Sequence, residues 1–253
     1  MCTLVLGLEL DRRWPVIVAA NRDELLARPA EGWAVRGAAG GGPPSATPLD
    51  LEAGGTWIGV SARGVFAGLT NFHLRPGEVP DRSRRSRGEL VPLALSRAGA
   101  AEAAAVVGAL DASRWNPFHL VVADGRGGWL WWYDGEEQGL ERLEPGLHVV
   151  TERDREGRGP RGDRVRARWP AHPTLPLLRG LLVDHGDGDA RRGGPGPEAA
   201  TCLHGDPLYG TRSSAILRLA SDLASSDLWV AEGRPCTTPH EDRSGLLVSL
   251  SRA

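Results

Sequence analysis

The second residue of the chain is a cysteine, and its place beside Met1 gives it a possible chemical role. A residue as small as Cys2 allows methionine aminopeptidase to remove Met1, so we expect a mature chain that begins with a thiol and a free α-amine on one residue. An α-amine titrates near ~7.7–8.0 and a thiol near ~8.5, so each group can assist the other close to neutral pH. An N-terminal amine that acts as base for its own side chain is a known means of activating a nucleophile. The alternative interpretation is a small residue that merely begins a strand.

A predicted hairpin brings polar groups to this thiol. Residues 3–8 and 15–20 form two apolar runs typical of strands, separated by a polar break at residues 11–14. If the turn centres near residues 11 and 12, antiparallel pairing places Cys2 opposite roughly Asn21. The thiol would then lie beside an amide, a guanidinium and two carboxylates, contributed by Asn21, Arg22, Asp23 and Glu24. A polar network that only stabilises the ends of the hairpin is the alternative.

Apolar runs and turn residues predict the elements that support this cluster. A second hairpin over residues 56–60 and 65–71 ends on Asn71. Ser86 and Glu89 have capping-box spacing before a helix at residues 90–95, and an alanine-rich helix is expected at 100–110. Residues 153–168 predict a solvated loop, residues 184–200 a mobile loop, and residues 172–183 a helix broken by prolines. Further strands are expected at residues 118–123, 128–133, 146–150, 215–219, 228–231 and 246–250, which together favour an α+β fold with antiparallel sheets.

Eight short blocks, taken in chain order, resemble the signature blocks of the NRDE protein family, the transport and Golgi organisation protein family. Any one block is weak, but their order is specific and they span nearly the whole chain. The blocks are Cys2-Thr3; Asn21-Arg22-Asp23-Glu24 with Arg28-Pro29; Gly54-Gly55-Thr56-Trp57-Ile58-Gly59; Leu69-Thr70-Asn71-Phe72; Ser86-Arg87-Gly88-Glu89-Leu90; Asn116-Pro117-Phe118; Pro145-Gly146-Leu147-His148; and Tyr209-Gly210-Thr211-Arg212-Ser213-Ser214.

The resemblance implies an N-terminal-nucleophile (Ntn) hydrolase-like fold, a four-layer αββα sandwich of two antiparallel sheets flanked by helices, in a single domain over residues 2–253. The related choloylglycine hydrolases and penicillin V acylases also begin at cysteine once methionine is removed. Carried over residue by residue, Cys2 resembles the nucleophile and Asp23 the carboxylate that holds the cysteine amine. Asn71 resembles an oxyanion-hole donor and Arg212 the active-site arginine.

Three further residues are candidate substrate-binding residues: Arg22, His73 and Glu152. Arg22 lies beside the position of the acylases' arginine but at a different offset. The resemblance implies asparagine at the position of Glu152, because the family usually has asparagine there and the acylases have it too. A carboxylate accepts hydrogen bonds and would repel an oxyanion, so either Glu152 points elsewhere or the protein does not hydrolyse amides in the standard way.

Composition excludes several classes of function. The formal net charge of -2 gives no reason to expect nucleic acid or an anionic membrane as partner. The three cysteines are widely spaced and odd in number, which argues against a disulfide framework or a zinc knuckle, and no histidine spacing suggests a metal. The start of the chain lacks a basic n-region and no apolar run is long enough to span a membrane, so we expect a cytoplasmic protein.

Two functions follow from the sequence. The first is a hydrolase that needs no cofactor and acts on the amide or thioester bond of a small-molecule acyl substrate. The second is a non-catalytic protein on the same fold that binds or moves haem or an acyl lipid, because the resemblance links the family with haem movement and lipid metabolism. A cluster of arginines before the predicted helix could bind an anion or form a solvated loop: Arg82, Arg84, Arg85 and Arg87. The oligomeric state is not indicated.

Overall fold

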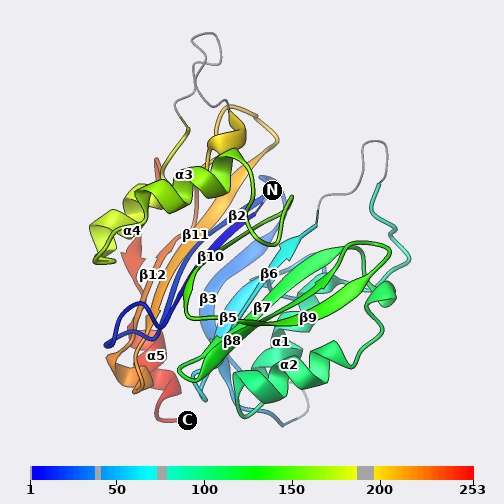
Figure 1. The fold of residues 1–253 in the computed structure, drawn as a ribbon, viewed down its shortest axis with the longest axis vertical. Helices are drawn as coiled ribbons and strands as arrows, with labels where there is room; N and C mark the ends of the chain where they lie inside the picture. The colour runs from blue at the N-terminus through cyan, green and yellow to red at the C-terminus, as the bar shows by residue number, and fades with distance from the viewer. Residues whose placement is uncertain (1, 38–40, 73–78, 187–196) are drawn as a thin grey trace.

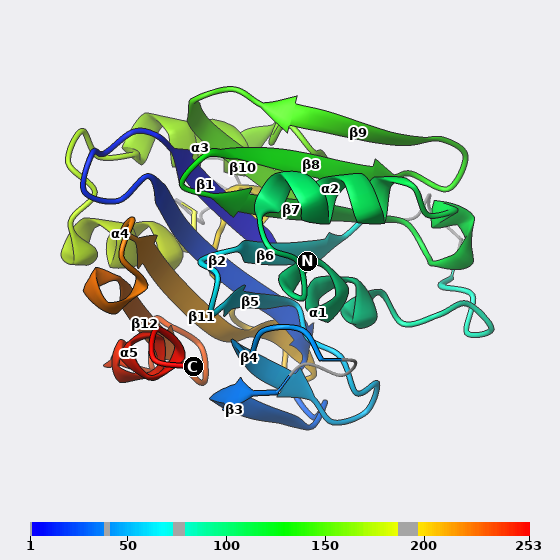
Figure 2. The ribbon, with the colours of Figure 1, turned by 90° about the horizontal axis from the view of Figure 1, so that it is seen from below.

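The computed structural model describes residues 2–37, 41–72, 79–186 and 197–253. Two antiparallel sheets lie face to face (Figures 1 and 2). Sheet A has the order β10-β1-β2-β11-β12-β13, with β1 Thr3–Leu8, β2 Val16–Leu25, β10 Gly146–Thr151, β11 Tyr209–Leu219, β12 Asp227–Ala231 and β13 Glu241–Asp242. Sheet B runs from β3 to β9 in sequence order, with β3 Ala30–Arg36, β4 Ser45–Asp50, β5 Ile58–Ser61, β6 Phe66–Asn71, β7 Phe118–Asp124, β8 Gly127–Tyr133 and β9 Gln138–Leu143.

Helices cover the outer face of each sheet. Helices α1 (Leu90–Leu95) and α2 (Ala100–Gly108) lie on sheet B, and α3 (Pro160–Arg168) and α4 (Leu175–Leu182) lie on sheet A (Figure 2). Helix α5 (Gly245–Leu250) is the last helix in sequence order and packs near β12. One apolar core fills the space between the sheets and two more fill the spaces between each sheet and its helices. The predicted four-layer αββα arrangement is therefore confirmed.

The alternation of β1 and β2 decides which face each polar residue reaches. Leu4, Val18 and Ala20 belong to the core between the sheets, whereas Val5 and Ala19 pack under the helices of sheet A. Because successive side chains of a strand point to opposite faces, the even-numbered residues of this hairpin face sheet B and the odd-numbered ones face the helices. Because these strands are buried on both faces, apolar residues occupy successive positions, which explains the continuous apolar runs in the sequence.

The register of the first hairpin differs from the prediction by one residue. Thr3, not Cys2, pairs with Asn21. The connection is a wide loop rather than a tight turn, since Glu9 N–H donates to the carbonyl of Pro15 and Asp11 Oδ1 accepts from the backbone of Trp14. The second predicted hairpin is confirmed, with β5 and β6 joined by a turn in which Gly64 has a φ of 72°, and β6 ends on Asn71.

Two predicted elements are wrong in type. The second half of the predicted loop at residues 153–168 forms α3, which Pro160 can begin because its fixed φ suits the first turn. Its Val165 is buried against sheet A. The predicted strand at residues 246–250 is helix α5, whose Leu247 and Leu250 lie three residues apart and both enter the core between the sheets. Short apolar runs do not distinguish a strand from a buried helix.

The predicted capping box is also wrong. Ser86 makes no side-chain cap bond, and a 3₁₀ turn over Arg87–Glu89 precedes α1. Glu89 instead accepts a hydrogen bond from Trp115 Nε1 at 2.6 Å. Strands β3, β4 and β9 were not predicted. Among the described residues, no helix combines the length and apolar character needed to cross a bilayer.

Candidate active site

A cleft of about 1020 Å³ opens where β2 and β6 end and β11 begins. Cys2 lies in its wall, and Arg22, Asn71 and Arg212 line the same cleft. Three of the four residues predicted to be catalytic thus line one cleft, although they come from the start, the first third and the end of the chain. The alternation of the first hairpin explains why Cys2 and Arg22 reach this cleft, because even-numbered positions of β1 and β2 face sheet B.

The thiol of Cys2 is almost fully buried, with 7% of the residue exposed. Its Sγ lies 3.9 Å from the backbone carbonyl of Asp23. Burial raises the pKa of the Cys2 thiol, and the neighbouring Asp23 carboxylate raises it further, while the positive charge of the chain's amino terminus and of Arg22 lowers it. A thiolate at this position therefore depends on a nearby positive charge.

Asp23 lies behind Cys2, on the face of β2 that points toward the helices. Its Oδ1 accepts a hydrogen bond of 2.6 Å from Thr211 Oγ1, and its backbone carbonyl accepts one of 3.0 Å from the Tyr209 hydroxyl. Burial raises the pKa of Asp23 to about 7, against the lowering effects of the amino-terminal charge and the Thr211 hydrogen bond. A carboxylate in this place can hold an amine near the thiol without reaching into the cleft.

Arg212 enters the cleft because of an irregularity in β11. The pairing of β11 with β2 shifts between Thr211 and Ser213, so that Arg212 is the extra residue of a β-bulge. Bulges redirect a side chain that regular alternation would have placed elsewhere. Arg212 Nε is buried and has no hydrogen-bond partner among the described residues. This guanidinium nitrogen is therefore available to an acceptor on a ligand.

Asn71 is exposed at the end of β6 and lines the same cleft. Arg22 is held in an ionic cluster, with its Nη2 3.3 Å from Asp50 Oδ2 and 3.5 Å from Glu24 Oε2. Arg28 Nε also contacts Asp50 Oδ2, at 2.7 Å. Asp50 thus fixes two arginines against the cleft wall.

Arg87 is a cleft residue that the sequence placed only in a general anion-binding cluster. Its Nη1 donates to the carbonyl of Pro117 at 2.9 Å, and burial lowers its pKa, while the nearby Cys2 and Glu24 raise it. The backbone of Gly88, the residue after Arg87, packs closely against Gly55. A Cβ on Gly55 would lie 2.5 Å from the carbonyl carbon of Gly88, so this close packing requires glycine at residue 55. The Ser86-Arg87-Gly88 block was the available signal.

Glu152 does not line the cleft; it is buried beneath the amino-terminal strand. Its Oε2 accepts from Arg161 Nη1 at 2.9 Å, and the side chains are only 3% and 6% exposed. The same Arg161 nitrogen lies 3.4 Å from Thr3 Oγ1. Burial has the largest effect on the pKa of Asp23 and raises it. The positive charge of Arg161 lowers the pKa of Asp23, and the negative charge of Glu152 raises it. The pair therefore acts on the electrostatics behind Cys2.

Asn21 is a predicted residue that lies apart from the cleft wall. Asn21 faces the helices, where its Nδ2 donates to the carbonyls of Leu182 and Thr201, both at 2.8 Å. It ties the segments on either side of residues 187–196 to β2. The predicted substrate-binding residue His73 lies outside the residues that the structure describes.

Comparisons with known proteins bear on the family and the fold of this chain. A family model described as Transport and Golgi organisation 2 matches residues 1–169. The homologues of that name from Mus musculus and Homo sapiens are each 36% identical over 115 residues, a region covering 43% of this chain and 38% of each relative. This chain therefore matches less than half the length of those relatives.

Similar solved structures share the fold. A penicillin V acylase from Agrobacterium tumefaciens matches with a TM-score of 0.55 and 15% identity, covering 92% of this chain and 83% of its own. A Caenorhabditis elegans N-acylethanolamine-hydrolyzing acid amidase ortholog matches with a TM-score of 0.53 and 11% identity, covering 85% and 92%. A variant of the conjugated bile acid hydrolase from Clostridium perfringens matches with a TM-score of 0.55 and 8% identity, covering 96% and 93%. The fold is the Ntn-hydrolase sandwich of these neighbours.

Proposed function

This chain belongs to the Transport and Golgi organisation 2 family, and from that premise we propose that it is an N-terminal-cysteine hydrolase that cleaves an amide or thioester acyl bond. One observation carries the proposal: a buried thiol at residue 2 lines a deep cleft and has a carboxylate directly behind it. The neighbours that share the fold are named as an acylase, an amidase and a bile acid hydrolase, which supports the same class of reaction.

The reaction begins with removal of Met1, which turns the backbone nitrogen of Cys2 into an α-amine. That amine takes the thiol proton, and the thiolate attacks the acyl carbon of the substrate. The amide of Asn71 donates to the oxygen that becomes negative, and the leaving amine or thiol receives the proton from the α-ammonium. Water then attacks the acyl-enzyme, which releases a carboxylic acid and restores the thiol.

Asp23 acts in this scheme as the group that orients the α-amine. The pKa of its carboxyl is raised to about 7 chiefly by burial, so a new positive charge on Cys2 would favour the ionised form. The same charge would favour the thiolate, whose pKa burial otherwise raises. Removal of Met1 is therefore required for the nucleophile to become active.

The lining of the cleft favours an acyl substrate that carries an anionic group. Arg87 and Arg212 line the same cleft as Cys2, and Arg212 Nε has no hydrogen-bond partner among the described residues. Trp57 and Leu69 supply apolar surface in the same cleft. A carboxylate or phosphate at one end of the ligand and an apolar acyl chain at the other would match both parts.

Mass spectrometry with iodoacetamide tests the nucleophile directly. The purified protein should lack Met1, and Cys2 should be alkylated by a limiting dose at mildly acidic pH well before Cys202 and Cys236. A Ser249→Cys variant adds an ordinary exposed thiol as a reference, since Ser249 lies on the surface of α5. Retained Met1, or a Cys2 that reacts no faster than the thiol at position 249, contradicts the mechanism.

A panel of acyl amides and thioesters tests turnover. Both Cys2→Ala and Cys2→Ser should abolish hydrolysis while leaving the unfolding midpoint close to that of the unmodified protein. Asn71→Ala should reduce kcat by roughly 10²–10³, which is typical for loss of one oxyanion donor. Unchanged turnover in both Cys2 variants would sink the hydrolase proposal.

The second candidate function is binding or transport of haem or an acyl lipid without catalysis. It is favoured by Glu152, which stands where the family resemblance implies an oxyanion-supporting asparagine and is instead paired with Arg161. Titration with haemin separates the two functions: a saturable Soret shift, weakened in Arg212→Gln and accompanied by no turnover, supports the binding protein. Absence of a saturable shift argues against it.

A further inference from the structure

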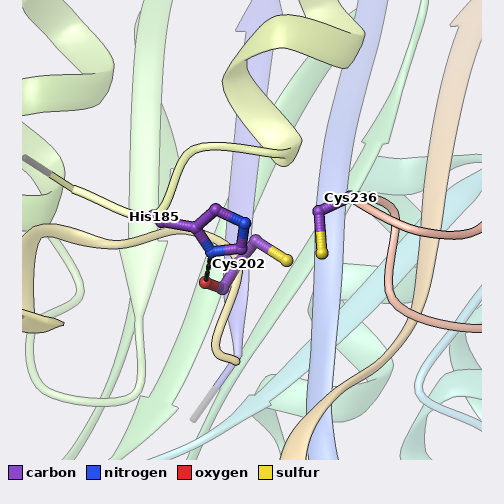
Figure 3. A group of neighbouring side chains, drawn as sticks. All are labelled: His185, Cys202 and Cys236. Carbon is purple, nitrogen blue, oxygen red and sulfur yellow. Dashed lines mark hydrogen bonds between the residues drawn. The ribbon is translucent and has the colours of Figure 1, made fainter. Parts of the chain in front are cut away.

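A cluster of sulfur and nitrogen atoms lies outside the residues used so far. Figure 3 shows the imidazole of His185 and the thiols of Cys202 and Cys236 turned toward one another. Their possible ligand atoms all lie within 4.8 Å of one another. The three residues come from distant segments: His185 follows α4, Cys202 precedes β11 and Cys236 follows β12.

A second imidazole adjoins this group. His204 Nδ1 lies 3.4 Å from Cys236 Sγ. The rings of His185 and His204 meet edge to face, with centroids 5.5 Å apart. Two thiols and two imidazoles thus gather at one place, although none of the four residues lines the cleft that contains Cys2.

We propose that His185, Cys202, His204 and Cys236 form a zinc site. Zinc prefers four sulfur and nitrogen ligands in a tetrahedron, and sites with four protein ligands are structural rather than catalytic. Zinc–sulfur bonds of about 2.3 Å and zinc–nitrogen bonds of about 2.0 Å imply ligand atoms roughly 3.5 Å apart. The ligand atoms of His185, Cys202 and Cys236, which lie within 4.8 Å of one another, would draw closer around the ion, and His204 would turn from Cys236 to supply the fourth ligand. Two thiols become thiolates bonded to Zn²⁺, and their two protons pass to solvent.

The hydrogen bonds around the cluster favour metal binding. His185 Nδ1 lies 3.0 Å from the carbonyl oxygen of Cys202, which can only accept, so Nδ1 carries the proton and Nε2 is left as an acceptor (Figure 3). A backbone carbonyl that fixes the tautomer of a ligating histidine is a common feature of metal sites. The thiol of Cys202 is buried and that of Cys236 half-buried, which limits the access of water to the sulfurs.

The site would brace the segment that supports Asp23. Leu203, directly after Cys202, exchanges hydrogen bonds with Thr211: its N–H donates to Thr211 Oγ1 at 2.8 Å, and its carbonyl accepts from Thr211 N–H at 3.1 Å. Thr211 in turn donates to Asp23. A metal bound by Cys202 and His204, on either side of Leu203, would therefore help to hold in place the strand that carries Thr211. The inference does not depend on the proposed hydrolase activity.

Metal binding to the whole protein, purified under reducing conditions and stripped with a chelator, tests the site. Cobalt(II) should bind in a one-to-one ratio with tetrahedral d–d bands and a thiolate-to-cobalt charge-transfer band, and zinc should displace it. Cys236→Ser and His204→Gln, at partly or fully exposed positions, should each weaken cobalt binding at least about tenfold, as loss of one direct ligand would. Cys2→Ala removes the remaining thiol of the chain and should leave the titration unchanged.

Several outcomes would overturn the zinc site. One is the absence of a charge-transfer band in reduced protein, and another is unchanged binding in both Cys236→Ser and His204→Gln. A third is a Cys202–Cys236 disulfide that forms readily while the reduced protein binds no metal, which would assign the two thiols to a redox pair instead. Circular dichroism of each variant confirms that lost binding does not reflect unfolding. All of these readouts are taken without substrate, so failure of the hydrolase proposal leaves them unaffected.

Discussion

The buried ion pair between Glu152 and Arg161 provides a quantitative test of how the amino-terminal strand is supported. Glu152→Gln keeps the shape of the side chain and an acceptor for Arg161 Nη1, but removes the only carboxylate placed at hydrogen-bond distance from that nitrogen among the described residues. The Arg161 side chain is 6% exposed, so its charge would be left inside the protein without its ion-pair partner.

Removing one partner of a buried pair costs about 3–5 kcal/mol, because the remaining charge is still desolvated. For a domain of this size, 1 kcal/mol shifts the melting temperature by about 2–4 °C, so Glu152→Gln should lower it by about 6–20 °C. The double variant Glu152→Leu with Arg161→Met should recover most of that loss, since it removes both charges and fills similar volume.

A matched control comes from an exposed ion pair. Arg243 Nη2 lies 2.7 Å from Glu241 Oε2, a distance close to that of the buried pair, but the side chains are 50% and 65% exposed. Glu241→Gln should therefore cost less than about 1 kcal/mol. Urea unfolding followed by circular dichroism measures all the variants. If Glu152→Gln lowers the free energy of unfolding no more than Glu241→Gln does, then burial does not increase the contribution of this ion pair to stability, and the reasoning is refuted.

The remaining predictions concern the cleft and the core. Arg212→Gln should weaken inhibition by an anionic acyl analogue by about 10–100-fold, the value of one hydrogen bond to a charged group, and equal inhibition constants would contradict its role. Thr211→Val should raise the pKa of Asp23 further, because the lost hydrogen bond lowers it, and should displace the pH profile of turnover upward; a profile that stays in place refutes this. Burial lowers the pKa of His119 from 6.5 to about 4. Neutral His119 therefore contributes roughly 3 kcal/mol to the free energy of unfolding above pH 6.5, and this contribution should be lost as the pH falls through 4. Unfolding of His119→Asn, measured over the same pH range, should show a flatter pH dependence. Gly55→Ala should destabilise the protein by about 1–3 kcal/mol and disturb the neighbouring turn, and a urea midpoint equal to that of the unmodified chain would show that the close approach is not required.

The parts of the site that rest on local patterns could be predicted. The apolar runs on either side of residues 11–14 determined the first hairpin, and the turn ending at Gly64 determined the second, so the approach of Asp23 to Cys2 and the position of Asn71 followed. The register was wrong by one residue because the connecting loop is wide. Since side chains alternate with a period of two, only the structure could show that Cys2 and Arg22 share one face while Asp23 lies on the other.

The parts that depend on long-range packing could not be predicted. Arg212 enters the cleft through a bulge that arises where β11 pairs with β2, nearly 190 positions away in sequence, and no residue type marks such a bulge. The arginine-rich segment that forms α3 resembled a solvated loop because its buried members, Arg161, Gly162 and Val165, are few among many charges. The residues of the proposed zinc site were hidden by their spacing, since His185 and Cys236 are separated by two strands.

These long-range contacts converge on one physical problem, the creation of a charged nucleophile in a buried place. Burial raises the pKa of both Cys2 and Asp23, so a chain that keeps Met1 opposes the thiolate. The new α-ammonium of a processed chain would lie between these two groups and favour the charged form of each, as the charge of the amino terminus already does in part. Arg161 and Thr211 lower the pKa of the same carboxyl from the helix side. Under the proposed mechanism, processing of the amino terminus, rather than a change in the cleft itself, would therefore decide whether the thiol can react.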